Sequence, residues 1–326
     1  MNKKLFAPLL FFSIILNGCA TIKFDFQIET GKKSESEIFH ELLKSEWEKG
    51  IERNPEWASR LGDNRFNDKL NDASYETILN RQEEAKDLLE KVKKIDRADL
   101  DETDHLNYDL YLHGIQKLIE GYQFLSYLMP IDQMGGIQIG FAGISNYMPF
   151  NSEKDYENYL SRLAAFPTKI NQTIDLMKRG IETGWEPPKI VLGSVPVQIK
   201  AHFEKPINES PLFKPFNNFP ESMNEETQKQ LTEKMKTILT EKVYPAYESL
   251  FTYFTESYLP VCRESIACKD FPNGDSYYKF KIKSYTTTDK TALEIHDIGL
   301  NEVARIRAEM MDVKDATEFD GSFDEF

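Results

Sequence analysis

Apolar residues recur every three to four positions along most of this 326-residue chain, a period typical of amphipathic helices. The pattern predicts a mainly α-helical protein. We expect a kink at Pro167 and an interruption at Pro245, because proline removes a backbone hydrogen bond from a helix. The clearest helical stretches are residues 36–53, 74–94, 103–128, 151–184, 227–258 and 291–311.

The helix predicted over 291–311 is the most strongly specified. Thr291 and Glu294 have the spacing of a capping box at its start. A stripe this regular needs a surface to pack against, yet the chain ends soon afterwards at Phe326. We therefore expect the partner of this stripe to lie outside the chain. The apolar positions of the stripe are Ile295, Ile298, Val303, Ile306 and Met310.

One segment instead has the alternating pattern of a half-buried strand. Over residues 276–288, Tyr278, Phe280 and Ile282 alternate with lysines, and the turn-forming sequence PNGD precedes them. We expect one short β-strand or hairpin region near 276–288 within the multi-helix domain. One strand is not stable alone and would need partners that the rest of the sequence does not provide.

The N-terminus has the pattern of an export signal. The basic MNKK is followed by LFAPLLFFSIIL, a largely apolar stretch of 12 residues that is too short to span a bilayer core of ~30 Å. The last leucine of this stretch begins LNGC, residues 16–19, which resembles a lipobox in which Cys19 would be the lipidated residue. The alternative is an ordinary secretory signal with a chance cysteine. We predict a signal peptide over 1–18, a tether over 19–34 and a helical domain over 35–326.

Lipidation at Cys19 predicts an exported protein held at a membrane, because two or more acyl chains give stable anchoring. By resemblance to Gram-negative lipoproteins, Ala20 after the cysteine favours the outer membrane, with the protein facing the periplasm. The net charge of −14 argues against nucleic acid as a partner, since phosphate binding needs clustered Lys and Arg.

Two further cysteines, Cys262 and Cys268, lie close together in the sequence. Export allows a disulfide, but six residues of continuous helix would separate the two by ~9 Å, too far for a bond. A disulfide therefore requires a helix end between them, and the following KDFPNGD makes an end near Ala267 plausible. Both states of the pair remain open at this point.

The histidines give no complete catalytic constellation and no set of metal ligands. HELLK at His40 has Lys44 where a zinc motif needs a second histidine. His105 and His113 are two helical turns apart, too far to share one ion. His296 lies one step off the apolar stripe, where it either lines a cleft or is a structural histidine. The Gly135–Gly136 pair allows a close backbone approach or simply joins two helices.

Several stretches together resemble one family, the bacterial DUF885 proteins, which are similar to gluzincin-type zinc metallopeptidases. They are NPEWASRLGDNRFNDKLNDAS, FPTKINQTIDLMKRGIETGWEPPKIVL and CRESIACKDFPNGDSYYKFKIKSYTTTDKTALEIHDIGLNEVARIRAEM, together with the glycine pair. The resemblance covers nearly the whole mature chain and implies the N-terminal half of such a fold, truncated at its C-terminal end.

The resemblance implies a zinc motif of the form H-E-x-x-P-G-H-H only in the full-length family member, and this chain lacks it. The chain as written is then not catalytic. Alternatives are a non-catalytic lipoprotein that binds a peptide or a partner, and a non-functional gene fragment. In zincin folds an edge strand binds the extended substrate. We therefore expect five residues to flank a peptide cleft, namely Tyr277, Tyr278, Thr286, Thr287 and Thr288.

Overall fold

The computed structural model describes residues 33–326, so the predicted signal peptide, Cys19 and most of the tether lie outside it. The described chain is helical, joined by turns and short 3-10 segments, and no strand occurs between residues 33 and 326. The α-helices are α1 (Glu35–Arg53), α2 (Pro55–Arg60), α3 (Tyr75–Lys93), α4 (Glu102–Gly121), α5 (Ile137–Gly140), α6 (Glu153–Ala164), α7 (Phe166–Thr183), α8 (Val195–Lys200), α9 (Glu225–Ile238), α10 (Tyr244–Tyr253), α11 (Gly274–Thr286) and α12 (Ala292–Ala316). None of them has the length and apolarity needed to cross a membrane.

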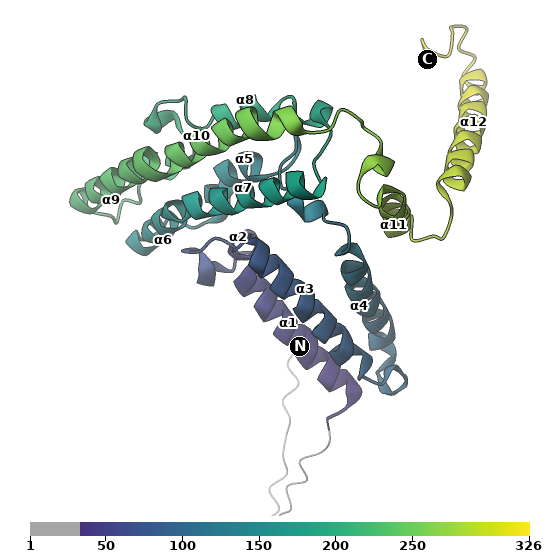
Figure 1. The fold of residues 1–326 in the computed structure, drawn as a ribbon, viewed down its shortest axis with the longest axis horizontal. Coiled ribbons are helices and arrows are strands. Elements are labelled where there is room, and N and C mark those ends of the chain that lie inside the picture. Colours follow the sequence, from purple (N-terminus) through teal and green to yellow (C-terminus); the bar gives the residue numbers. More distant parts are fainter. Residues whose placement is uncertain (1–32) are drawn as a thin grey trace, which may run out of the picture.

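Helices α1, α3 and α4 form the N-terminal layer (Figure 1). Ser34 caps α1 in a capping box with Glu37, which fixes where this layer starts. Phe39 is fully buried and packs edge-on against Tyr108 of α4, with ring centroids 5.8 Å apart. Val92 of α3 lies in the same small core. The layer therefore has its own hydrophobic centre.

The largest core lies between α6, α7 and the long helical run from α9 to α10. Phe166 is fully buried at the start of α7, stacked on Phe141 at 4.1 Å and packed on Tyr247 at 4.7 Å. Gly184 ends α7 in a left-handed conformation (φ 75°), which glycine adopts readily at a helix C-terminus. Only Ala165, itself in the right-handed helical region, separates α6 from α7, and Pro167 lies in the first turn of α7, so the kink predicted at this proline is an interruption one residue long.

The predicted interruption at Pro245 takes the form of a π-helical turn. Residues Leu239–Val243 are π-helical and lead directly into α10, where Pro245 lies in the first turn. A second π-turn, Phe254–Tyr258, precedes Pro260 in the same way. Proline has no N–H to donate, so a wider turn before it lets the helical run continue without the missing bond.

The strand predicted near 276–288 is wrong, because this segment forms α11. Tyr277 is nearly buried and packs against Trp185 and Phe124, with ring centroids 5.1 and 5.2 Å apart. Phe280, three residues later, also packs on Phe124, at 5.1 Å. The three-residue spacing of these two aromatic side chains suits a helix. Their contacts with distant parts of the chain outweigh the local alternation of apolar residues and lysines.

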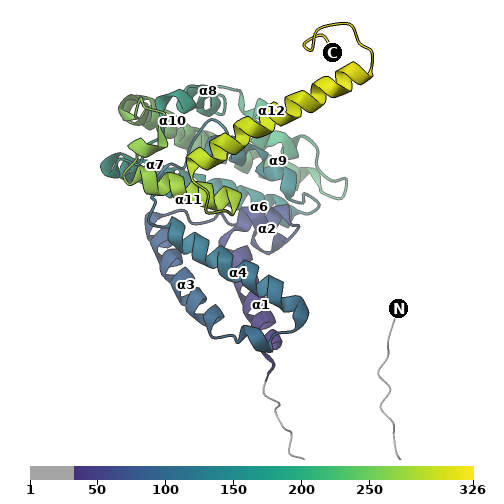
Figure 2. The same ribbon diagram turned by 90° about the vertical axis from the view of Figure 1, so that its right-hand side faces the viewer.

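Helix α12 follows the prediction in its start but has no buried residue. Thr291 and Glu294 form the expected capping box. The helix lies beyond α11, away from α6 and α9 (Figure 1), and its far end extends past the body of the molecule (Figure 2). Val303 is 66% exposed and Ile306 is 44% exposed. The apolar stripe is thus an open surface in this structure.

We expect the double substitution Val303→Lys and Ile306→Lys to leave the free energy of unfolding within about 0.5 kcal/mol of the original protein, because neither side chain is buried. Self-association should decrease, since exposed apolar patches promote it. Urea unfolding and sedimentation velocity measure the two effects. Leu163→Lys, at a fully buried position, is the destabilising control. A similar loss of stability in both proteins would show that α12 is packed.

Candidate functional site

A groove of about 590 Å³ lies where α11 turns into α12. Thr286 ends α11 by donating its hydroxyl to the Ile282 carbonyl at 2.8 Å, and its Oγ1 lies 3.0 Å from that of Thr288. Thr287 adopts a left-handed conformation (φ 53°) and reverses the chain direction. The threonine triplet therefore sets the angle between the two helices and with it the width of the groove.

Of the five residues predicted to flank a cleft, the structure brings Tyr278 and Thr288 to this groove. Tyr278 is 49% exposed and can contact a bound molecule. Tyr277 points instead into the aromatic cluster around Trp185, where it has a structural role. Thr286 and Thr287 shape the turn without lining the groove.

The groove carries a local excess of positive charge within an acidic protein. Lys279, Lys283 and Lys290 line it, and none of the three forms an ion pair within the described part of the chain. Asp275 and Asp289 also line it and leave a net charge of +1. Apolar contacts come from Ile282 and Leu293. A ligand that combines carboxylates with apolar side chains would complement this surface.

The other predicted site residues lie elsewhere. His296 is exposed on the first turns of α12 and does not line the groove, so both of its predicted roles stay predictions. Cys262 and Cys268 are both free thiols in the structure. Cys262 belongs to the largest core, whereas Cys268 packs against the aromatic cluster of α11. Burial raises the pKa of the Cys262 thiol to about 12, which makes this thiol unreactive at neutral pH.

The structure also has a cavity of about 280 Å³ between α2, α5 and α7. Gly136 forms part of its wall with φ 120°, and a Cβ there would lie 3.0 Å from the Pro130 carbonyl. Only glycine fits this backbone without strain. Gln138, which is 1% exposed, holds the loop by donating to the Asp132 and Gly135 carbonyls at 2.8 and 3.0 Å. Of the two roles considered for the glycine pair, the structure therefore shows the close backbone approach, at Gly136.

Three charged residues that sequence reasoning missed stand at this cavity: Glu56, Arg60 and Lys169. The Lys169 ammonium donates to the side-chain oxygen of Asn71 and to its backbone carbonyl, the latter at 3.1 Å. Burial lowers the pKa of Lys169, and the nearby Glu56 charge opposes this shift. Glu56 accepts a hydrogen bond from the Asn71 amide at 3.0 Å. The loop around Asn71 therefore joins the two helices that carry these side chains.

Arg162 of α6 positions α2 beneath the cavity. It is fully buried, yet within residues 33–326 it has no carboxylate partner. Its guanidinium donates to the carbonyls of Lys69, Phe66 and Pro55 at 2.7, 2.9 and 3.2 Å, and to the Ser59 hydroxyl at 3.0 Å. Arginine can serve so many acceptors because it has five N–H donors in a fixed plane. These bonds tie the start of α2 to the chain that follows it.

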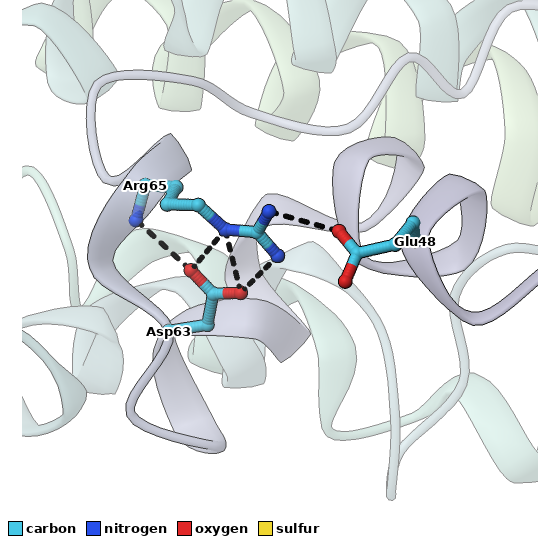
Figure 3. Close-up of polar contacts among 3 residues, drawn as sticks. All are labelled: Glu48, Asp63 and Arg65. Carbon is cyan, nitrogen blue, oxygen red and sulfur yellow. Dashed lines mark hydrogen bonds and ion pairs between the residues drawn. The ribbon is translucent and has the colours of Figure 1, made fainter. Parts of the chain in front are cut away.

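On the exposed side of the same corner, Arg65 lies between two carboxylates (Figure 3). It pairs with Glu48 at 2.8 Å and Asp63 at 2.7 Å. The hydrogen bonds from Arg65 lower the pKa of the Asp63 carboxyl. Water screens this network, so its contribution to stability is small.

The residues present do not fit the zinc ion that the family resemblance implies. No group of three His, Cys, Asp or Glu side chains that could hold a metal occurs between residues 33 and 326. His40, at the incomplete zinc motif, lies 2.9 Å from the Asp104 carboxylate instead. This hydrogen bond lowers the pKa of Asp104, which is nearly buried. We therefore derive no reaction step through zinc.

Comparisons with known proteins agree with the sequence resemblance. The model of the family described as "Bacterial protein of unknown function (DUF885)" matches residues 55–326. A crystal structure described as "the putative lipoprotein from Colwellia psychrerythraea" superposes with a TM-score of 0.77 at 20% identity. The match covers 89% of this chain and 52% of that one, so the present chain spans about half its length. At this identity the similarity shows the fold. No curated protein matches.

Proposed function

This chain belongs to the DUF885 family, and we propose that it is an exported, lipid-anchored protein that binds peptides in the groove between α11 and α12. The LNGC sequence at Cys19 supports the anchor, together with the similarity to a protein described as a lipoprotein. In a Gram-negative cell, the protein would be held at the outer membrane and face the periplasm.

The groove is the observation that supports peptide binding. It places three lysines that have no carboxylate partner within residues 33–326 beside Tyr278, Ile282 and Leu293. Tyrosine is a common anchor in binding surfaces, and lysines add charge complementarity toward an acidic partner. An extended peptide with alternating acidic and apolar residues would pair its carboxylates with the lysines. Its apolar side chains would pack on Tyr278 and Leu293.

We propose that residues 33–326 contribute binding and that any zinc-dependent hydrolysis in this family uses groups outside them. We also propose that the exposed stripe of α12 packs against the remainder of a longer DUF885 fold. Two observations support this second proposal. The stripe is open to solvent along its length, and the similar crystal structure has about twice as much chain.

A fluorescent peptide of alternating Glu and Leu should bind the protein, and Tyr278→Ala or Lys283→Ala should weaken binding about tenfold, the loss typical of an anchoring side chain. Raising the salt concentration should weaken it too, because exposed charges are screened. Fluorescence anisotropy measures both effects. Tyr285→Ala is the matched control, since Tyr285 is 82% exposed on α11 and lies outside the groove.

A second peptide of alternating Lys and Leu has the same length and apolar content but the opposite charge. It should bind much more weakly than the Glu–Leu peptide. Equal affinity for the two peptides would contradict the assigned role of the lysines. No saturable binding of either peptide, or full binding by Tyr278→Ala, would refute peptide binding in this groove.

A further inference from the structure

The cavity between α2, α5 and α7 is separate from the α11–α12 groove and shares no lining residue with it. Its volume of about 280 Å³ suits a small molecule and is near the lower limit of ligand pockets, roughly 300 Å³. The peptide-binding proposal does not use this cavity. Its lining is apolar on one side and charged on the other. A ligand that fits it would therefore have an apolar part and a charged part.

The apolar side of the cavity is built from buried, packed side chains. Phe141, Ile144 and Leu176 line it, and each is at least nine-tenths buried. Phe141 is held by stacking on Phe166, and Leu176 belongs to the aromatic cluster at Trp185. An apolar group placed here would replace water on surfaces that are already fixed. Such a surface favours a short branched or aromatic chain, because burial of apolar area provides the free energy.

The charged side of the cavity keeps a net positive charge within the described residues. Arg60 makes no hydrogen bond or ion pair in the described chain, and its guanidinium lies 4.7 Å from the centre of the Tyr147 ring. All its N–H donors are therefore available. The Lys169 ammonium has three donors and uses two on Asn71. With Glu56 as the one carboxylate, the three charges sum to +1.

From this arrangement, we propose that the cavity binds a small apolar carboxylate, whose anionic group pairs with Arg60 and Lys169 and whose apolar chain packs on Phe141, Ile144 and Leu176. A planar carboxylate can accept two parallel bonds from a guanidinium. Glu56 supports the site without contacting the anion, because it holds the Asn71 loop and keeps a negative charge near Lys169.

Two sources share this chemistry: short fatty acids and apolar amino acids. The test is calorimetric titration of the full-length protein with 4-methylpentanoate, 4-methylpentanamide, acetate and leucine. We expect saturable binding of 4-methylpentanoate, with the amide and acetate at least about tenfold weaker because each lacks one half of the recognised group. Leucine that binds as tightly would identify amino acids as the ligand class. Leucine that binds poorly would identify fatty acids.

Arg60→Gln should weaken 4-methylpentanoate about tenfold without lowering the unfolding temperature, because Arg60 is exposed and forms no ion pair in the described chain. Arg179→Gln is the matched control. Arg179 also lies over a tyrosine ring, 4.1 Å from the centre of Tyr75, but outside the cavity. The proposal is overturned if no carboxylate binds, if acid and amide bind equally, or if Arg60→Gln binds as well as the original protein. Tyr278→Ala should weaken peptide binding and leave 4-methylpentanoate binding unchanged. The peptide proposal and the carboxylate proposal can therefore be refuted independently of each other.

Discussion

Replacing Arg162 with methionine is expected to lower the free energy of unfolding by about 3–5 kcal/mol, because several carbonyls inside the protein lose their donor and each unsatisfied acceptor costs roughly 1–3 kcal/mol. The side chain is fully buried and serves three backbone carbonyls and one hydroxyl. Methionine fills a similar volume but donates no hydrogen bond. The carbonyls of Pro55, Phe66 and Lys69 would be left without this partner.

Urea unfolding followed by circular dichroism measures the effect. Arg65→Met is the matched control, because Arg65 makes a comparable set of hydrogen bonds on the exposed side of the same corner (Figure 3). Its loss should lower the free energy of unfolding much less, because water screens exposed ion pairs. Arg162→Lys should fall between the two, since one ammonium cannot reach acceptors on several sides. Equal stability of the Arg162→Met and Arg65→Met proteins would show that Arg162 does not hold α2 in place.

Replacing Cys19 with serine is expected to move the protein from the membrane to the soluble fraction. The thiol at this position would carry the lipid, and serine cannot form the thioether. Dual or triple acylation holds a protein at a bilayer, whereas a single chain gives only reversible binding. Cys19 lies outside the described residues, so this prediction rests on the sequence and on the similarity to a protein described as a lipoprotein.

Metabolic labelling with an alkyne fatty acid and detergent phase separation measure this second effect. Cys268→Ser is the control, since Cys268 is a free thiol that packs against α11 and is not part of the signal. The original protein and the control should be labelled and enter the detergent phase. Labelling that persists in the Cys19→Ser protein would contradict lipidation at this residue.

Local chemistry made most helix ends predictable. Thr291 with Glu294 and Gly184 act within one turn of their own helix, so their roles can be inferred without knowledge of the fold. The error at 276–288 has the opposite cause. Tyr277 packs against Trp185 and Phe124, which are distant in sequence, and no local pattern contains those contacts.

The site residues also include some that local sequence indicated and others that only the fold reveals. Tyr278 and Thr288 both line the groove, on a helix and a turn in place of the predicted strand, and their role at a substrate cleft stays a prediction. Glu56 and Arg60 lie four residues apart on α2, and Lys169 lies on α7, so the three were missed because only the fold brings Lys169 to the other two. The Gly135–Gly136 pair was the available signal for the cavity, and its meaning depended on the φ of 120° that only the structure provides.

Hydrogen exchange of the full-length protein, with and without the Glu–Leu peptide, tests peptide binding most directly, because it locates the bound peptide along the chain. We expect slower exchange in the segment from Asp275 to Leu293, which contains the groove, and no change around the cavity at Gly136 and Lys169. Protection confined to the cavity, or no protection anywhere despite saturating peptide, would contradict the account.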